Sequence, residues 1–257
     1  MSQLYDEIGL GYRDYRRPDP RLAAAITRAL NRTDTVVNVG AGSGSYEPSD
    51  RRVVAVEPAM TMIRQRRPGS APVVQASATD LPFRDESFGA ALAVLTVHHW
   101  PDHARGLGEL ARVARQRVVV VTWDPSATGF WLTDDYLPDL MAIDRRIFPA
   151  MEDFRRAFGG VDILPLLIPY DCSDGFLGAY WRRPHAYLDA RVRGAISTFA
   201  KLRDAGRDIE GLERLRRDLA DGGWERRYGD LLDRSEIDVG YRIVIAAKSG
   251  TVAVTAL

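Results

Sequence analysis

Residues 36–44 read Val36-Val37-Asn38-Val39-Gly40-Ala41-Gly42-Ser43-Gly44, an apolar run that ends in a glycine-rich turn. A second apolar run, Val53-Val54-Ala55-Val56, ends on the acid Glu57. Uninterrupted apolar runs are typical of central strands in a parallel sheet. A glycine-rich loop lets the backbone approach a ligand closely, and an acid at the end of the next strand can accept ribose hydroxyls. Together the two motifs predict a nucleoside pocket at the carboxyl edge of an α/β sheet.

Apolar strand patterns alternate with short helical patterns through the first half of the chain. We expect strands at residues 35–39, 52–56, 72–76, 89–97 and 117–122, and helices at about 21–30, at 58–67 and from Pro101. This alternation predicts a doubly wound parallel sheet. The segment 45–50 contains Pro48 and is too short for a full crossover helix, so we predict only a turn between the first two strands.

After Trp123 the pattern changes from alternating strands to helices and loops. Residues 161–170 are apolar but contain two prolines, which predicts an irregular edge strand at best. Residues 241–247 again have the pattern of a strand. We therefore expect one domain over residues 1–257. Its core comprises about 20–123, 161–171 and 240–254, and a helical cover comprises about 124–160 and 172–239.

Composition excludes several classes of function. The chain has 257 residues, 46% hydrophobic content, 27% charged content and a net charge of zero, so it lacks the charge of a nucleic-acid-binding protein. Its single cysteine, Cys172, rules out an internal disulfide and a cysteine-rich zinc site, and we expect no metal. No apolar run approaches the roughly 20 residues of a membrane span. The N-terminus does not resemble a signal peptide, so we expect a cytoplasmic protein.

The order and spacing of the motifs resemble class I S-adenosylmethionine-dependent methyltransferases, in the ubiquinone/menaquinone-biosynthesis-like (methyltransferase type 11) branch. The similarity spans roughly residues 30–125 and rests on 36–44, Glu57-Pro58-Ala59-Met60, 77–83, 88–100 and the helix from Pro101. It implies a Rossmann-like, doubly wound α/β sheet of seven strands with a helical lid insertion. The last strand of such a sheet is antiparallel, and residues 241–247 are the candidate for it.

The resemblance implies S-adenosyl-L-methionine as cofactor and places its contacts residue by residue. Methionine recognition falls to the glycine loop and to residues after the fourth strand, ribose recognition to the end of the second strand, and adenine recognition to the end of the third. The implied residues are Asn38, Gly40, Ala41, Gly42, Glu57, Pro58, Ser77, Ala78, Leu95 and Thr96.

Two of these positions depart from the family's pattern. Relatives usually carry an acid at the position of Asn38, where it engages the methionine ammonium, and many carry one at Ser77. The amide oxygen of Asn38 can still accept a hydrogen bond, but without the charge. Residues 1–20 are expected to fold over the cofactor. Tyr12 and Arg16 are therefore candidate ligands, with Arg16 suited to the methionine carboxylate, although both are also compatible with an ordinary surface.

The glycine loop has two alternative interpretations. A dinucleotide fingerprint needs G-x-G-x-x-G before a helix whose N-terminus faces pyrophosphate, whereas here the glycines fall at 40, 42 and 44 and Ser45 takes the third position. The three glycines could also form only a tight turn. A sulfonium cofactor carries no phosphate, so a missing helix would cost it little.

His98 and His99 follow the fourth strand at the edge where ligands bind. Either could act as a general base for a nucleophilic oxygen, nitrogen or carbon acid, and either could simply shape the pocket. The residues alone do not choose between them.

Function is expected to be methyl transfer to a small-molecule acceptor by direct displacement. The cover is rich in aromatic residues that suit an apolar or planar substrate or, equally, its own packing: Trp123, Phe130, Trp131, Tyr136, Phe176, Tyr180 and Trp181. The alternatives are a protein of this fold that catalyses another reaction, such as a cyclisation, and one that only binds the cofactor. The sequence does not indicate an oligomeric state.

Overall fold

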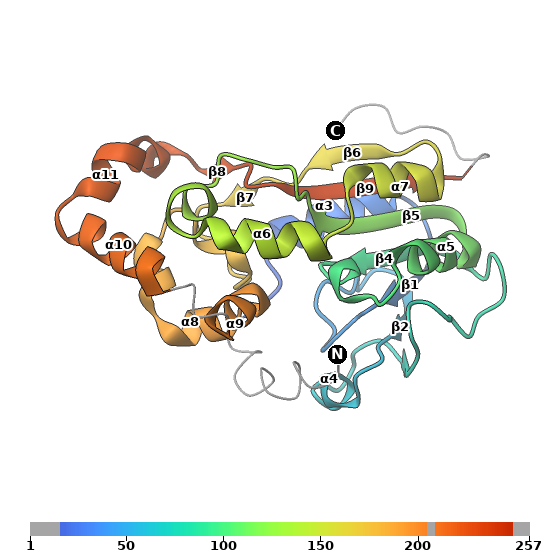
Figure 1. The fold of residues 1–257 in the computed structure, drawn as a ribbon. Coiled ribbons are helices and arrows are strands. Elements are labelled where there is room, and N and C mark those ends of the chain that lie inside the picture. The colour runs from blue at the N-terminus through green and yellow to red at the C-terminus, as the bar shows by residue number, and fades with distance from the viewer. Residues whose placement is uncertain (1–15, 205–208, 249–257) are drawn as a thin grey trace.

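A seven-stranded sheet forms the centre of the computed structural model, which describes residues 16–204 and 209–248 (Figure 1). The strands run in the order β3-β2-β1-β4-β5-β9-β6. The first five are parallel, and β9 is antiparallel to both β5 and β6. The bounds are β1 Thr35–Val39, β2 Arg52–Val56, β3 Val73–Val74, β4 Phe88–Val94, β5 Ala114–Trp123, β6 Asp162–Pro165 and β9 Tyr241–Ala247. The predicted Rossmann-like α/β sheet with an antiparallel seventh strand is confirmed.

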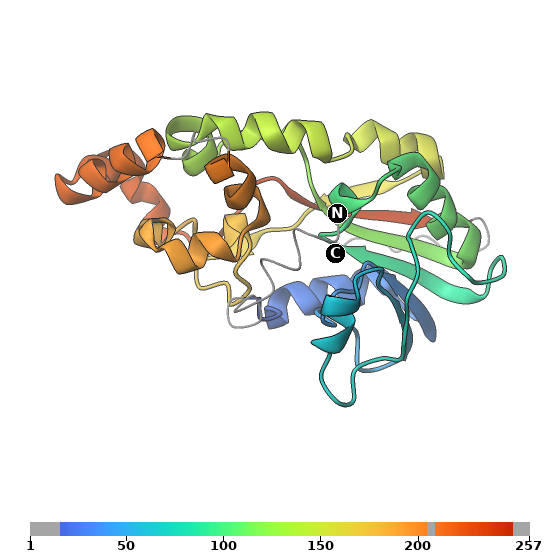
Figure 2. The same cartoon turned by 60° about the horizontal axis from the view of Figure 1, so that its bottom comes forward.

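Helices cover both faces of this sheet, as Figure 2 shows. Helix α3 (Pro20–Leu30) packs on one face, where Leu22, Ile26 and Leu30 are buried. The side chain of Asp19 caps it by accepting the Arg21 amide. The opposite face is covered by α5 (His103–Val113) and α7 (Met151–Phe158), which contact each other. Each face therefore has its own buried apolar cluster.

Apart from α7, which packs on the sheet beside α5, the helices after β5 form a cover at one end of the sheet (Figure 1). Its α-helices are α6 Pro138–Ile147, α8 Ala190–Gly194, α9 Ser197–Asp204, α10 Ile209–Ala220 and α11 Gly223–Tyr228. Single helical turns lie at Leu132–Tyr136, Leu177–Tyr180, Pro184–Leu188 and Gly229–Asp233. Most of the aromatic residues noted in the sequence pack inside this cover. Trp131, for example, is 3% exposed and donates its indole N–H to the carbonyl of Trp181.

Several predicted boundaries were wrong. β4 ends at Val94, three residues before the predicted end, because Leu95 has a φ of 50° and Val97–His99 form a 3₁₀ turn. β3 is only two residues long, β5 begins at Ala114, and α4 covers Met60–Arg64. The helix expected from Pro101 starts at His103, after the capping residue Asp102.

Two predictions about irregular segments can also be checked. Residues 42–46 form a turn, so no crossover helix joins β1 to β2. The proline-containing segment 161–170 is divided in two. β6 forms the sheet edge as expected, while β7 (Ile168–Pro169) pairs instead with β8 (Glu236–Ile237). None of the helices that the structure describes is both long and apolar enough to cross a membrane.

Candidate functional site

A cavity of about 230 Å³ lies at the carboxyl ends of β1, β2 and β4. Tyr12 lies outside the described residues. Every other residue predicted to bind the cofactor lines this cavity: Arg16, Asn38, Gly40, Ala41, Gly42, Glu57, Pro58, Ser77, Ala78, Leu95 and Thr96. His99 also lines it. The structure therefore brings together residues that are up to 83 positions apart, from 16 to 99, at one edge of the sheet.

Gly40 allows the first turn of the loop to pass directly against Thr96, in the segment that follows β4. Its φ is 73°, in the left-handed region that favours glycine. A Cβ at this position would lie 2.1 Å from Oγ1 of Thr96 and 2.8 Å from its Cβ. Because real atoms cannot approach so closely, residue 40 must be glycine while Thr96 keeps its place in the cavity wall.

Glu57 is held in place by the same loop. It is 7% exposed, and its two carboxylate oxygens accept separate backbone amides, Gly42 N at 2.8 Å and Ala59 N at 2.9 Å. Burial raises the pKa of Glu57, although these two amides act in the opposite direction. Each oxygen retains accepting capacity beside the cavity, so the side chain is preorganised to receive two hydroxyl groups.

The backbone of the glycine loop is not arranged to bind phosphate. The amides of Gly40 and Ala41 both donate to the carbonyl of Val56, at 2.8 and 3.0 Å. Gly42 N donates to Glu57, and Gly44 N donates to the carbonyl of Ala41. A dinucleotide site needs loop amides directed at pyrophosphate and a helix N-terminus behind them. These four amides bond within the protein and no helix follows, so the loop favours a ligand without phosphates.

Asn38 and Arg16, the two side chains predicted to contact the methionine portion, both line the cavity. Asn38 is 1% exposed in the middle of the sheet. Arg16 forms an ion pair, with Nε donating to Oδ1 of Asp174 at 2.6 Å. The role of Arg16 toward a cofactor carboxylate thus stays a prediction, and the guanidinium is already oriented by a buried acid.

A second cavity, of about 70 Å³, adjoins the first under the cover. Arg16, Leu95 and His99 line both cavities, so His99 lies at their junction. The ring of His98 faces only the second cavity and stacks on Phe148, with centroids 4.1 Å apart. The remaining walls are mostly aromatic or apolar and also include hydroxyls and a carboxylate: Trp123, Asp144, Phe176, Leu177, Ile196, Ser197, Thr198 and Tyr241.

Sequence reasoning missed several residues of the site. Tyr46 lines the first cavity, and Asp144 and Thr198 line the second, where the Thr198 hydroxyl donates to Oδ1 of Asp144. These residues come from a turn and from cover helices that carry no motif. The aromatic content did indicate Trp123 and Phe176. Burial raises the pKa of Cys172 to about 12, so this thiol does not supply a nucleophilic thiolate near neutral pH.

Comparisons with known proteins agree with this geometry. The methyltransferase domain family matches residues 37–122, which contain the glycine loop, Glu57 and both histidines. A crystal structure from Anabaena variabilis, described as a candidate methyltransferase of an antibiotic biosynthesis pathway, is 34% identical. The match covers 90% of this chain and 98% of that one, with a TM-score of 0.81. An uncharacterized protein of Mycobacterium tuberculosis is 26% identical over 238 residues, covering 79% of this chain and 81% of its own length.

The same fold also occurs in an enzyme with a different reaction. The structure of the [4+2]-cyclase SpnF is 16% identical, covers 96% of this chain and 95% of its own, and has a TM-score of 0.54. At this identity the likeness shows the fold alone. None of these comparisons specifies a ubiquinone or menaquinone pathway.

Proposed function

Since the chain belongs to the class I S-adenosylmethionine-dependent methyltransferases, we propose that it transfers a methyl group to a small-molecule acceptor. The observation that carries this proposal is the buried carboxylate of Glu57, held by two loop amides at the edge of a cavity whose glycine loop is unsuited to phosphate. A nucleoside without phosphates is the ligand that this combination fits best.

The residues of the first cavity suit the parts of the cofactor. Glu57 receives the ribose hydroxyls, Ser77 and Ala78 border the adenine, and Gly40, Asn38, Thr96 and Arg16 surround the amino-acid portion. Bound there, S-adenosyl-L-methionine supplies a methyl carbon, attached to a positively charged sulfur, that an acceptor atom takes by direct displacement. The protein's contribution is mainly to hold the two reactants in line and to exclude water.

The second cavity is the proposed acceptor site, because it shares His99 with the first and is lined by residues of the cover. Its aromatic walls favour a planar or apolar body, and Asp144, Ser197 and Thr198 offer hydrogen bonds to polar groups. The ion pair of Arg16 with Asp174 offsets the positive charge that would otherwise attract an anionic acceptor.

The proposal is tested by label transfer. The purified protein is incubated with methyl-labelled S-adenosylmethionine and a panel of phenols, amines and carbon acids. We expect one class to acquire the label while S-adenosylhomocysteine forms in equal amount. Binding of the cofactor with a chemical change in a panel member but no label transfer would instead favour another reaction, such as a cyclisation. Binding with neither change would favour a protein that only binds.

We expect His99 to remove the acceptor proton as the methyl group arrives. With an acceptor that takes the label, His99→Gln should lower kcat by about 100-fold, the size of a general-base contribution, with little change in S-adenosylhomocysteine affinity. The amide keeps the size and polarity of the ring but cannot take up a proton near neutral pH. Steady-state kinetics and calorimetry on the same preparation measure the two effects.

His98→Gln is the matched control, because His98 faces the acceptor cavity only. We expect it to raise KM for the acceptor, since the stacking on Phe148 is lost, while kcat changes by less than about 5-fold. An unchanged kcat in His99→Gln would show that this methyl transfer uses no base at residue 99.

A further inference from the structure

Three segments that are far apart in the sequence meet at one buried carboxylate. Asp174, in the loop after β7, is 1% exposed. Its Oδ1 accepts Nε of Arg16 at 2.6 Å, and its Oδ2 accepts the hydroxyl of Tyr46 at 2.9 Å and Nη2 of Arg16 at 3.4 Å. Arg16 precedes α3, and Tyr46 follows the glycine loop. The side chain of Asp174 thus connects the cover to both segments at once.

The two partners of Asp174 are cavity residues, but Asp174 is not. Arg16 lines both cavities and Tyr46 lines the first, whereas Asp174 is not among the residues that border either one. Tyr46 also has a φ of 60°, which is uncommon for a bulky residue. Burial and the nearby Asp174 raise the pKa of Tyr46, so its hydroxyl keeps the proton that it donates. Any effect of Asp174 on a ligand therefore passes through Arg16 and Tyr46.

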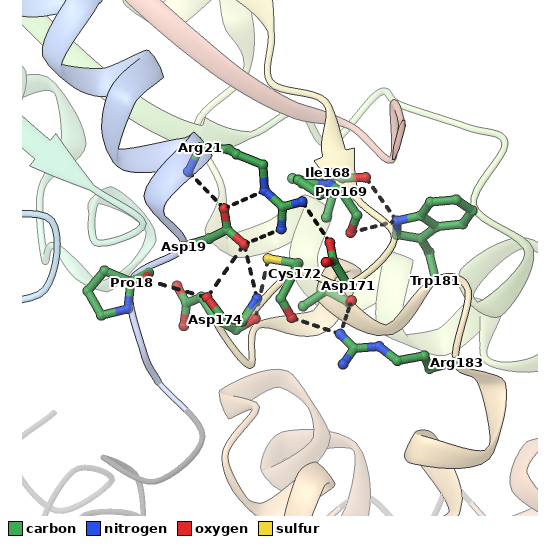
Figure 3. Close-up of polar contacts among 12 residues, drawn as sticks. Pro18, Asp19, Arg21, Ile168, Pro169, Asp171, Cys172, Asp174, Trp181 and Arg183 are labelled. Carbon is green, nitrogen blue, oxygen red and sulfur yellow. Dashed lines mark hydrogen bonds and ion pairs between the residues drawn. The ribbon is translucent and has the colours of Figure 1, made fainter. Parts of the chain in front are cut away.

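The loop that carries Asp174 has anchors of its own, shown in Figure 3. Ser173 N donates to Oδ2 of Asp19 at 3.1 Å, and Asp171 forms an ion pair with Arg21 at 2.7 Å. Arg183 donates to the carbonyl of Cys172 at 2.8 Å. These contacts do not involve the Asp174 carboxylate. Replacing that carboxylate is thus expected to leave the loop attached to the start of α3.

We propose that Asp174 is a positioning residue of the cofactor site, which fixes Arg16 and Tyr46 in the cavity wall and so makes cofactor affinity depend on the cover. This inference rests on the proposed function, because it assumes that the first cavity binds S-adenosylmethionine. A carboxylate is required, because it can accept from the guanidinium and the hydroxyl at once through two charged oxygens. An amide has one accepting oxygen, so Asp174→Asn leaves one of the two partners without its acceptor.

Calorimetric titration with S-adenosylhomocysteine tests this inference without an acceptor. We expect Asp174→Asn to raise the dissociation constant by roughly 10-fold or more, as for the loss of a charge-assisted hydrogen bond that orders the site. Arg16→Gln should have a loss of similar size. The double variant should lose no more than the larger single effect, because both changes remove one pair. If Asp174 served only to stabilise the fold, Asp174→Asn would lower the melting temperature. Its affinity for S-adenosylhomocysteine, measured well below that temperature, would not change, and this result would contradict the positioning role.

Asp171→Asn is the matched control, because Asp171 lies in the same loop and also pairs with an arginine but is half exposed and lines neither cavity. The dissociation constant of the Asp171→Asn variant for S-adenosylhomocysteine should stay within about 2-fold of the wild-type value. If Asp174→Asn does not fold, Arg16→Gln and Tyr46→Phe carry the test, and each is expected to weaken binding. Wild-type affinity in Asp174→Asn, or in both substitutes, overturns the positioning role. A wild-type protein that does not bind S-adenosylhomocysteine overturns the proposed function instead.

Discussion

Glu57→Gln is expected to weaken S-adenosylhomocysteine binding by about 100-fold, because hydrogen bonds to a charged group contribute about 1.5–3 kcal/mol each and two ribose hydroxyls are involved. In the folded protein the two carboxylate oxygens each accept a backbone amide, Gly42 N and Ala59 N. Glutamine can accept only one of them and turns its own N–H groups toward the other. The side chain must then move away from the position in which it would receive the ribose. Calorimetry measures the affinity directly.

Glu109→Gln is the control for this change. Glu109 also accepts a backbone amide, Leu81 N at 2.7 Å, and pairs with Arg112, but it lines neither cavity. The Glu109→Gln variant should have a free energy of unfolding lower by about 1 kcal/mol and an affinity for S-adenosylhomocysteine within about 2-fold of wild type. Unchanged affinity in Glu57→Gln, with the fold intact, would remove Glu57 from the ribose site.

Gly40→Ala is expected to be the most destabilising single change in the loop. An alanine would be strained at a φ of 73°, and its Cβ would lie 2.1 Å from Oγ1 of Thr96. The strain and the overpacking together should lower the free energy of unfolding by on the order of 3 kcal/mol, measured by urea denaturation. Cofactor binding should fall as well, because Thr96 lines the cavity and must shift.

Gly69→Ala separates the effect of backbone strain from the effect of the contact with Thr96. Gly69 has a φ of 85°, but no atom outside Gly69 and its two chain neighbours lies within 4 Å of the position that its Cβ would occupy. Only the backbone strain is present there, so we expect a loss of about 1 kcal/mol and unchanged cofactor affinity. Equal losses for Gly40→Ala and Gly69→Ala would contradict the account of the contact with Thr96. The double variant Gly40→Ala with Thr96→Gly removes the contact and should recover most of the difference.

The central sheet could be predicted from the sequence because its signals are local. Strands β1, β2 and β9 were predicted with their observed bounds, since each is a continuous apolar run that ends at polar or turn-forming residues. The end of β4 was misplaced because Leu95 and Val97 continue the apolar pattern after the chain has turned. An apolar pattern reports burial, and a buried turn carries the same pattern as a buried strand.

The residues that line the first cavity were predicted more completely than those that line the second, and the reason is the same. Residues of the first cavity follow strand ends in a fixed order, so position along the chain indicates position in space. Asp174 contacts Arg16, which is 158 positions away in the sequence, and Tyr46, which is 128 positions away. The sequence around Asp174 contains no motif that would indicate these contacts. The walls of the second cavity come from cover segments whose packing depends on long-range contacts. Function on such a sheet is determined largely by these segments.

Calorimetric titration of the wild-type protein with S-adenosylhomocysteine, in parallel with NAD⁺, tests the central claim most directly. The structure predicts one site per chain for S-adenosylhomocysteine, with a dissociation constant in about the micromolar range, and no measurable binding of NAD⁺. The difference follows from a glycine loop whose amides bond within the protein and which is not followed by a helix N-terminus that could hold pyrophosphate. Binding of NAD⁺ without binding of S-adenosylhomocysteine, or binding of neither, would contradict the assignment of the first cavity.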